Sequence, residues 1–148
     1  MNKTILLVVF CFFLFVSGYS QGIRFDSYPS HPRLLVKKGE EQKIKSDLAL
    51  NPEMLRLHNY LLKQCDELIT TPVLAYKKEG KRLLAVSREA LRRIFYLSYA
   101  YRMTGEDKYR LRAEQEMIAV CSFTDWNPSH FLDTGEMTMA VAIGYALK

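Results

Sequence analysis

The sequence predicts an all-α fold made of antiparallel helical hairpins that follow one another along the chain. Apolar residues between Met54 and Ile69 recur at spacings of three and four, which is the period of an amphipathic helix. Thr104-Gly105 separates two further helix-like segments, as expected for the short turn of a helical hairpin. No stretch of useful length alternates apolar and polar residues in the manner of a β-strand.

Residues 1–20 have the pattern of a signal peptide. Lys3 precedes the unbroken apolar run Ile5–Val16, which is too short to cross a bilayer. Small residues suit cleavage after Ser20, so we expect an exported protein, periplasmic or extracellular, with no stable membrane anchor after cleavage; an uncleaved N-terminal anchor is the alternative. Residues 21–37 then predict an extended lead-in, because they contain prolines and lack a helical period.

The composition narrows the classes of partner. The formal net charge is +5, a mild excess that fits an acidic polymer without requiring one. Arginines and lysines are scattered along the chain, which argues against nucleic acid as a partner. Cys65 and Cys121 lie on apolar faces of predicted helices, which favours buried free thiols over the disulfide that export would permit. No Cys/His spacing typical of zinc is present, so no metal site or cofactor is expected.

Residues 38–148 predict one helical domain. Its first helix covers Lys38 to Leu50. Asn51-Pro52 predicts the start of a second helix, because Asn caps backbone donors and Pro is tolerated in the first turn. His58 lies on the apolar face of this second helix, where a packed and hydrogen-bonded residue is expected more often than a ligand.

A connector with several basic residues, Val73–Ala85, leads into the next helical hairpin. This connector could touch an anionic substrate, although a solvated loop is favoured. Ser87 is the expected N-cap of the third helix, which closes at Gly105 in a left-handed conformation. A return helix is expected from Glu106 or Asp107 to about Val120.

The polar stretch Ser122–His130 predicts a loop, and a final helix follows it. Asp133 and Glu136 have the spacing of a capping box at the start of that helix. The apolar face of its later part, from Met137 to Leu147, would need a further neighbouring helix to cover it.

Five stretches of the chain resemble the N-terminal helical domain of the heparinase II/III-like polysaccharide lyases. The stretches are HPRLL at 31–35, VSREALRRI at 86–94, YRMTGEDKY at 101–109, DWNPSHFLDTGEM at 125–137 and AVAIGY at 140–145. This resemblance implies that residues 38–148 form part of an α/α toroid that is incomplete in this chain. It also implies an enzyme that cleaves uronate-containing polysaccharides, such as heparin or heparan sulfate, by β-elimination. In the family the catalytic residues belong to later motifs, so none is assigned here, activity stays open, and this chain by itself is expected to be inactive.

The resemblance and the residue types together nominate a substrate-binding set near the last helix: Trp126, Asn127, His130 and Glu136. Trp126 offers a flat face for a sugar ring, Asn127 and His130 can hydrogen-bond hydroxyl or acid groups, and a helix N-terminus favours an anion. The alternatives are that Trp126 packs in the core and that Asp133 and Glu136 only cap the helix.

Two other functions are alternatives for an exported all-α chain. The chain could be a non-catalytic, secreted helical module that binds a glycan or a protein. A glycoside hydrolase on the same toroid is disfavoured, because Asp133 and Glu136 lie three residues apart at one helix end and cannot flank a glycosidic bond.

Overall fold

The computed structural model describes residues 31–32 and 34–147, and this part of the chain is all-α, as predicted. The expected signal peptide, residues 1–20, and most of the expected lead-in lie outside the described residues. Within the described residues no helix is long and apolar enough to cross a membrane. The described helices are α2 (Glu40–Leu50), α3 (Pro52–Thr70), α4 (Leu84–Thr104), α5 (Asp107–Cys121) and α6 (Phe131–Leu147).

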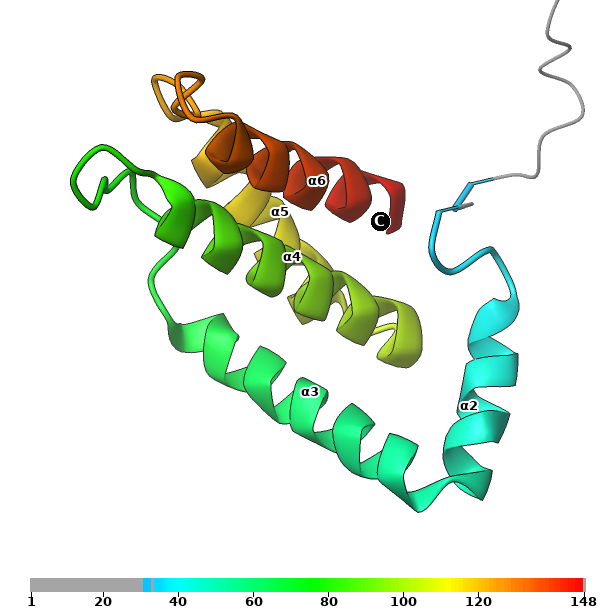
Figure 1. The fold of residues 1–148 in the computed structure, drawn as a ribbon. Helices are drawn as coiled ribbons and strands as arrows, with labels where there is room; N and C mark the ends of the chain where they lie inside the picture. The colour runs from blue at the N-terminus through cyan, green and yellow to red at the C-terminus, as the bar shows by residue number, and fades with distance from the viewer. Residues whose placement is uncertain (1–30, 33, 148) are drawn as a thin grey trace, which may run out of the picture.

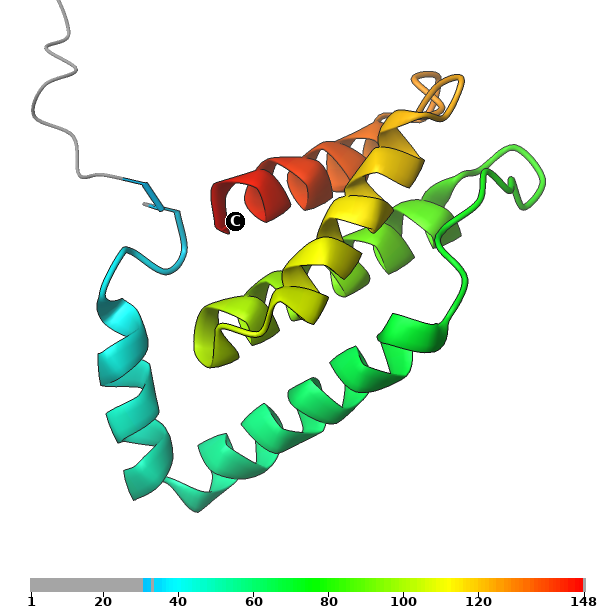
Figure 2. The same cartoon turned by 180° about the vertical axis from the view of Figure 1, so that it is seen from behind.

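Helix α4 is the centre of the arrangement and contacts every other described helix (Figure 1). Helices α4 and α6 run side by side in the same direction, while α3 and α5 run the opposite way (Figure 2). Consecutive helices from α3 to α6 are therefore antiparallel and form successive hairpins, of which α4–α5 is the predicted one that turns at Gly105, and α2 lies at the end of the bundle where α4 finishes.

Two apolar clusters hold these hairpins together. The first joins α3, α4 and α5 and is built around the buried residues Cys65, Leu97 and Tyr109. The second joins α4, α5 and α6 and the residue before α4, and it includes Leu83, Ile94 and Met137. Because both clusters contain residues of α4, burial of apolar side chains fixes α3, α5 and α6 on this central helix.

Several helix boundaries follow local signals that were predicted. The Asn51 side chain accepts hydrogen bonds from the backbone N–H groups of Glu53 and Met54, both at 3.1 Å. Gly105 ends α4 with a φ of 75°, the left-handed conformation that glycine adopts without steric cost. His58 is half-buried, and its Nδ1 atom lies 2.9 Å from the Tyr99 hydroxyl, consistent with a packed histidine.

Other predicted boundaries are wrong. The first helix begins at Glu40 rather than Lys38. Helix α4 begins at Leu84, so Ser87 lies inside its first turn; the Ser87 hydroxyl donates to the Leu83 carbonyl and does not cap the helix. The last two residues of the predicted connector, Leu84 and Ala85, already belong to the helix.

A buried carboxylate attaches the connector to α4 and α5. Glu116 of α5 is fully buried and accepts hydrogen bonds from Arg93, from Arg112 and from the backbone N–H of Leu74. Arg93 also donates to the Pro72 carbonyl at 2.8 Å. These contacts fix the first part of the connector against α4 and α5.

The last helix is covered on one side only. Met137, Ala140 and Gly144 are buried against the rest of the bundle. Helix α4 therefore covers much of the apolar face for which the sequence predicted a further neighbouring helix. Tyr145 remains 77% exposed. An apolar groove of about 460 Å³ runs between α5 and α6, lined by Glu114, Met117, Ile118, Cys121, Val141, Ala142 and Tyr145.

The two cysteines within the described residues, Cys65 and Cys121, differ in burial. Both are free thiols, as favoured from the sequence, and Cys65 is fully buried. Cys121, however, is exposed at the end of α5, so its predicted burial is wrong. The groove beside it leaves that face of α5 open.

Candidate functional site

Two loops meet at the end of the bundle where α4 and α6 begin (Figures 1 and 2). We name this region the loop end and define it as residues 71–83 and 122–130. The Tyr76 hydroxyl donates to the Asp125 carboxylate at 3.0 Å, and the Asn127 side-chain amide donates to the Lys81 carbonyl at 2.9 Å. Segments that are more than 40 residues apart in sequence therefore form one surface.

A tight turn gives the first loop its shape. The backbone N–H and C=O groups of Glu79 and Arg82 bond to each other at 2.9 and 3.1 Å. Gly80 occupies a positive-φ position inside this turn, at 59°. Lys81 is exposed beside it, and Arg82 leaves the turn toward the second loop.

The second loop is shaped by an aspartate-centred turn. The Asp125 carboxylate accepts a hydrogen bond from the backbone N–H of Asn127 at 2.7 Å, and this bond is the main reason that the pKa of Asp125 is lowered. Asn127 has a φ of 57°, which asparagine tolerates better than most residues. It is 3% exposed, so its amide faces the protein interior.

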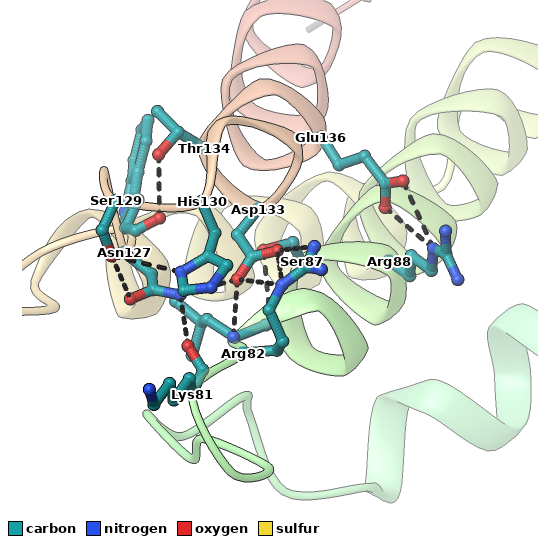
Figure 3. Close-up of polar contacts among 12 residues, drawn as sticks. Lys81, Arg82, Ser87, Arg88, Asn127, Ser129, His130, Asp133, Thr134 and Glu136 are labelled. Atoms are coloured by element: carbon teal, nitrogen blue, oxygen red, sulfur yellow. Dashed lines mark hydrogen bonds and ion pairs between the residues drawn. The ribbon is translucent and has the colours of Figure 1, made fainter.

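The carboxylate of Asp133 joins both loops to α6 (Figure 3). Arg82 donates to its Oδ1 atom through Nη2 at 2.6 Å and through Nε at 3.0 Å. The backbone N–H of Leu83 and the amide of Asn127 donate to its Oδ2 atom at 2.7 and 2.8 Å. The Asp133 side chain is fully buried, and these hydrogen bonds compensate for the lost hydration of its carboxylate.

These contacts give the Asp133 carboxylate a stable negative charge. The hydrogen bond from Arg82 is the largest cause that holds the pKa of Asp133 well below its usual range, and the Asn127 amide and the Leu83 N–H act in the same direction. Leu83 directly precedes α4, so the carboxylate also lies at the positive N-terminus of that helix.

The predicted capping box at the start of α6 is therefore wrong. Helix α6 begins at Phe131, so Asp133 falls within its first turn and reaches across to the start of α4. Glu136 does not reach back along its own helix; it pairs with Arg88 of α4, with 3.3 Å between Arg88 Nε and both carboxylate oxygens.

The four residues nominated for substrate binding do not form one cluster. Asn127 and His130 lie together, with 3.2 Å between the Asn127 amide nitrogen and His130 Nδ1. Glu136 lies apart from them, beside Arg88 (Figure 3). Trp126 donates from its indole nitrogen to the Val120 carbonyl at 2.8 Å and packs against the second apolar cluster, so it fills the packing role that was the alternative.

Trp126 nevertheless remains partly accessible. It is half-buried, and it borders a shallow depression of about 300 Å³ on the surface of the loop end. The other residues around this depression are Cys121, Phe123, Asp125, Pro128 and Thr134. Aromatic and hydrogen-bonding groups at one open surface are the usual components of a sugar-binding site.

The sequence alone did not identify Lys81 and Arg82 as members of this cluster. Arg82 and Asp133 are separated by 51 positions, and no local motif predicts that they pair. The only available signal was the basic character of the connector. Within the described residues, no group of His, Cys, Asp and Glu could hold a metal ion.

Neither the known protein families nor the curated proteins contain a match to this chain.

Proposed function

We propose that the loop end binds an acidic polysaccharide, and that the chain is part of the α/α toroid of an exported heparinase II/III-like lyase. The proposal rests on the resemblance of five stretches of sequence and on one structural observation. That observation is the convergence of Arg82, Asn127 and His130 around Asp133, at the end of the bundle where α4 and α6 both begin.

The electrostatics of the loop end support an anionic ligand. Lys77, Lys78 and Lys81 are exposed on the first loop, and Arg82 is partly exposed. The carboxylate of Asp133 is buried behind Arg82, and among the charged side chains that face solvent on this loop only Glu79 is negative. A repeating polyanion gains from several such contacts at once.

Binding fits the chemistry of this cluster better than proton transfer. The Asp133 carboxylate is fully buried and is engaged by Arg82, Leu83 and Asn127. A general base must instead be able to take up a proton from the substrate. This observation favours ligand binding at the loop end, with the reacting groups of a lyase supplied from other motifs.

Binding and turnover can be measured in one titration. Trp126 is the only tryptophan in the chain, so its fluorescence reports on the loop end directly. We expect saturable changes with polygalacturonate, alginate or heparin, weakened by salt, and none with neutral dextran or with duplex DNA at equal charge. Failure of every uronate polymer to bind would contradict the proposal.

The same mixtures test the alternative function. Absorbance of the unsaturated sugar product would rise only if the chain itself catalyses β-elimination. Binding without product is the expected result. The same result is expected of a non-catalytic glycan-binding module, whereas formation of product would contradict that alternative.

A further inference from the structure

Arg82 is held in place by a buried partner while part of its side chain faces solvent. Its Nε and Nη2 atoms point at the Asp133 carboxylate, at 3.0 and 2.6 Å from Oδ1. The Asp133 side chain is 0% exposed, whereas the Arg82 side chain is 40% exposed. One edge of the guanidinium is therefore used inside the protein, while the side chain as a whole stays partly exposed.

The position of Asp133 is itself fixed. Its second oxygen accepts from the backbone N–H of Leu83 at 2.7 Å and from the Asn127 amide at 2.8 Å. Arg82 therefore pairs with a carboxylate whose own position is fixed by two further hydrogen bonds. Folding has already restricted the rotamers of Arg82, so a ligand that binds it loses less conformational entropy than it would at a free arginine.

A guanidinium has two edges that can each bind a planar anion. Asp133 uses the edge formed by Nε and Nη2, and no hydrogen bond joins Nη1 of Arg82 to the described residues. The other edge, Nη1 with the second hydrogen of Nη2, matches the two oxygens of a carboxylate. Lys81 is exposed next to it in the chain and adds positive charge.

We propose that this outer edge of Arg82 binds the carboxylate of a uronate residue in the polysaccharide. The inference rests on the proposed function and adds to it the group of the ligand that is recognised. Asp133 acts as a positioning residue, because it touches Arg82 and not the ligand. His130 lies beside the same cluster, and Nδ1 near the Asn127 amide leaves Nε2 as the ring atom available to a neighbouring sugar hydroxyl.

The test compares two ligands and two arginines. The ligands are polygalacturonate and its carboxyl-reduced form, a neutral polymer with the same linkages, followed by Trp126 fluorescence. We expect the wild-type chain to bind the reduced polymer about tenfold more weakly or worse, as expected when a charged hydrogen-bonded pair is lost. R82K keeps the charge but lacks the planar edge, so we expect it to lose about tenfold in affinity for the carboxylate form.

The matched control is R56K. Arg56 pairs with Glu53 on the exposed surface of α3, and R56K should bind as the wild type does. Circular dichroism melts establish whether R82K is folded. If R82K does not fold, the inference is tested by the wild-type affinities for the two polymers. Equal binding of both polymers by the wild type, or full affinity in folded R82K, would overturn the inference while leaving polymer binding intact. A wild-type chain that binds no uronate polymer would instead remove the proposed function itself.

Discussion

Asp133 is the single residue on which the geometry of the loop end depends. Its carboxylate accepts hydrogen bonds from a side chain of the first loop, a backbone N–H at the start of α4 and a side chain of the second loop. Removal of this carboxylate would separate all three segments at once. The consequence should be visible both in stability and in binding.

The first prediction concerns D133N. The amide of asparagine has one acceptor oxygen in place of two, so either Leu83 N–H or the Arg82 guanidinium is left without its acceptor. A buried donor without a partner costs roughly 1–3 kcal/mol, and the free energy of unfolding measured in urea should fall by about that amount. The control D47N removes an exposed pair with Lys43 and should change stability by about 0.5 kcal/mol or less. Equal effects of D133N and D47N would contradict the assignment.

The second prediction concerns acid. Because the folded protein lowers the pKa of Asp133, the folded state holds this proton less tightly than the unfolded chain, whose reference value is 3.8. The stability that the ionised carboxylate contributes is complete above that value and is lost as the pH falls through the folded pKa. Urea midpoints of the wild type should therefore decline below about pH 4 more steeply than those of D133N. Parallel declines would show that Asp133 is not responsible.

At the scale of helices, local signals were predicted and contacts between distant segments were not. Asn51 and Gly105 act on their own neighbours in the chain, so residue type and position sufficed to predict a helix start and a helix end. Ser87 and Asp133 also had the correct residue types for caps. Both were misassigned, because each helix begins two or three residues earlier than its apparent cap.

The third prediction tests the packing of α6 on α4. A Cβ added at Gly144 would lie 2.3 Å from Ile94 Cγ2 and 2.9 Å from Met117 Sδ, so G144A must displace core side chains. Overpacking of this kind costs roughly 1–3 kcal/mol in the free energy of unfolding. In the same helix a Cβ at Gly135 would meet nothing within 4 Å, and G135A should stabilise by about 0.5–1 kcal/mol. The melting temperature should fall in G144A and rise in G135A relative to the wild type. Shifts of both variants in the same direction would contradict this packing.

At the scale of the whole molecule, periodicity identified apolar faces but not what covers them. Met54 and Leu57 follow the apolar period of α3, yet they are 42% and 58% exposed. The loop end was predicted only in part for the same reason. Trp126, Asn127 and His130 are close in sequence, whereas Arg82 joins them only because α6 packs on α4.

The fourth prediction uses the difference between the two thiols of the helical domain. Cys65 is fully buried, and its burial raises the pKa of the thiol to about 12, so it is protonated and inaccessible in the folded state. Cys121 is exposed beside the apolar groove. Peptide mapping after brief alkylation should find Cys121 modified and Cys65 unmodified until urea unfolds the protein. Similar rates for both thiols under native conditions would contradict the described core.

The most direct test of the account is to map where an acidic sugar contacts the molecule. In an NMR titration with a short uronate oligosaccharide, we predict shifts for the Trp126 indole N–H, the Arg82 guanidinium and the amides of residues 127–130. Signals of Tyr145, near the C-terminal end of α6, should stay unchanged. Shifts confined to the groove beside Tyr145, with the loop end unaffected, would contradict the claim that the loop end is the binding site.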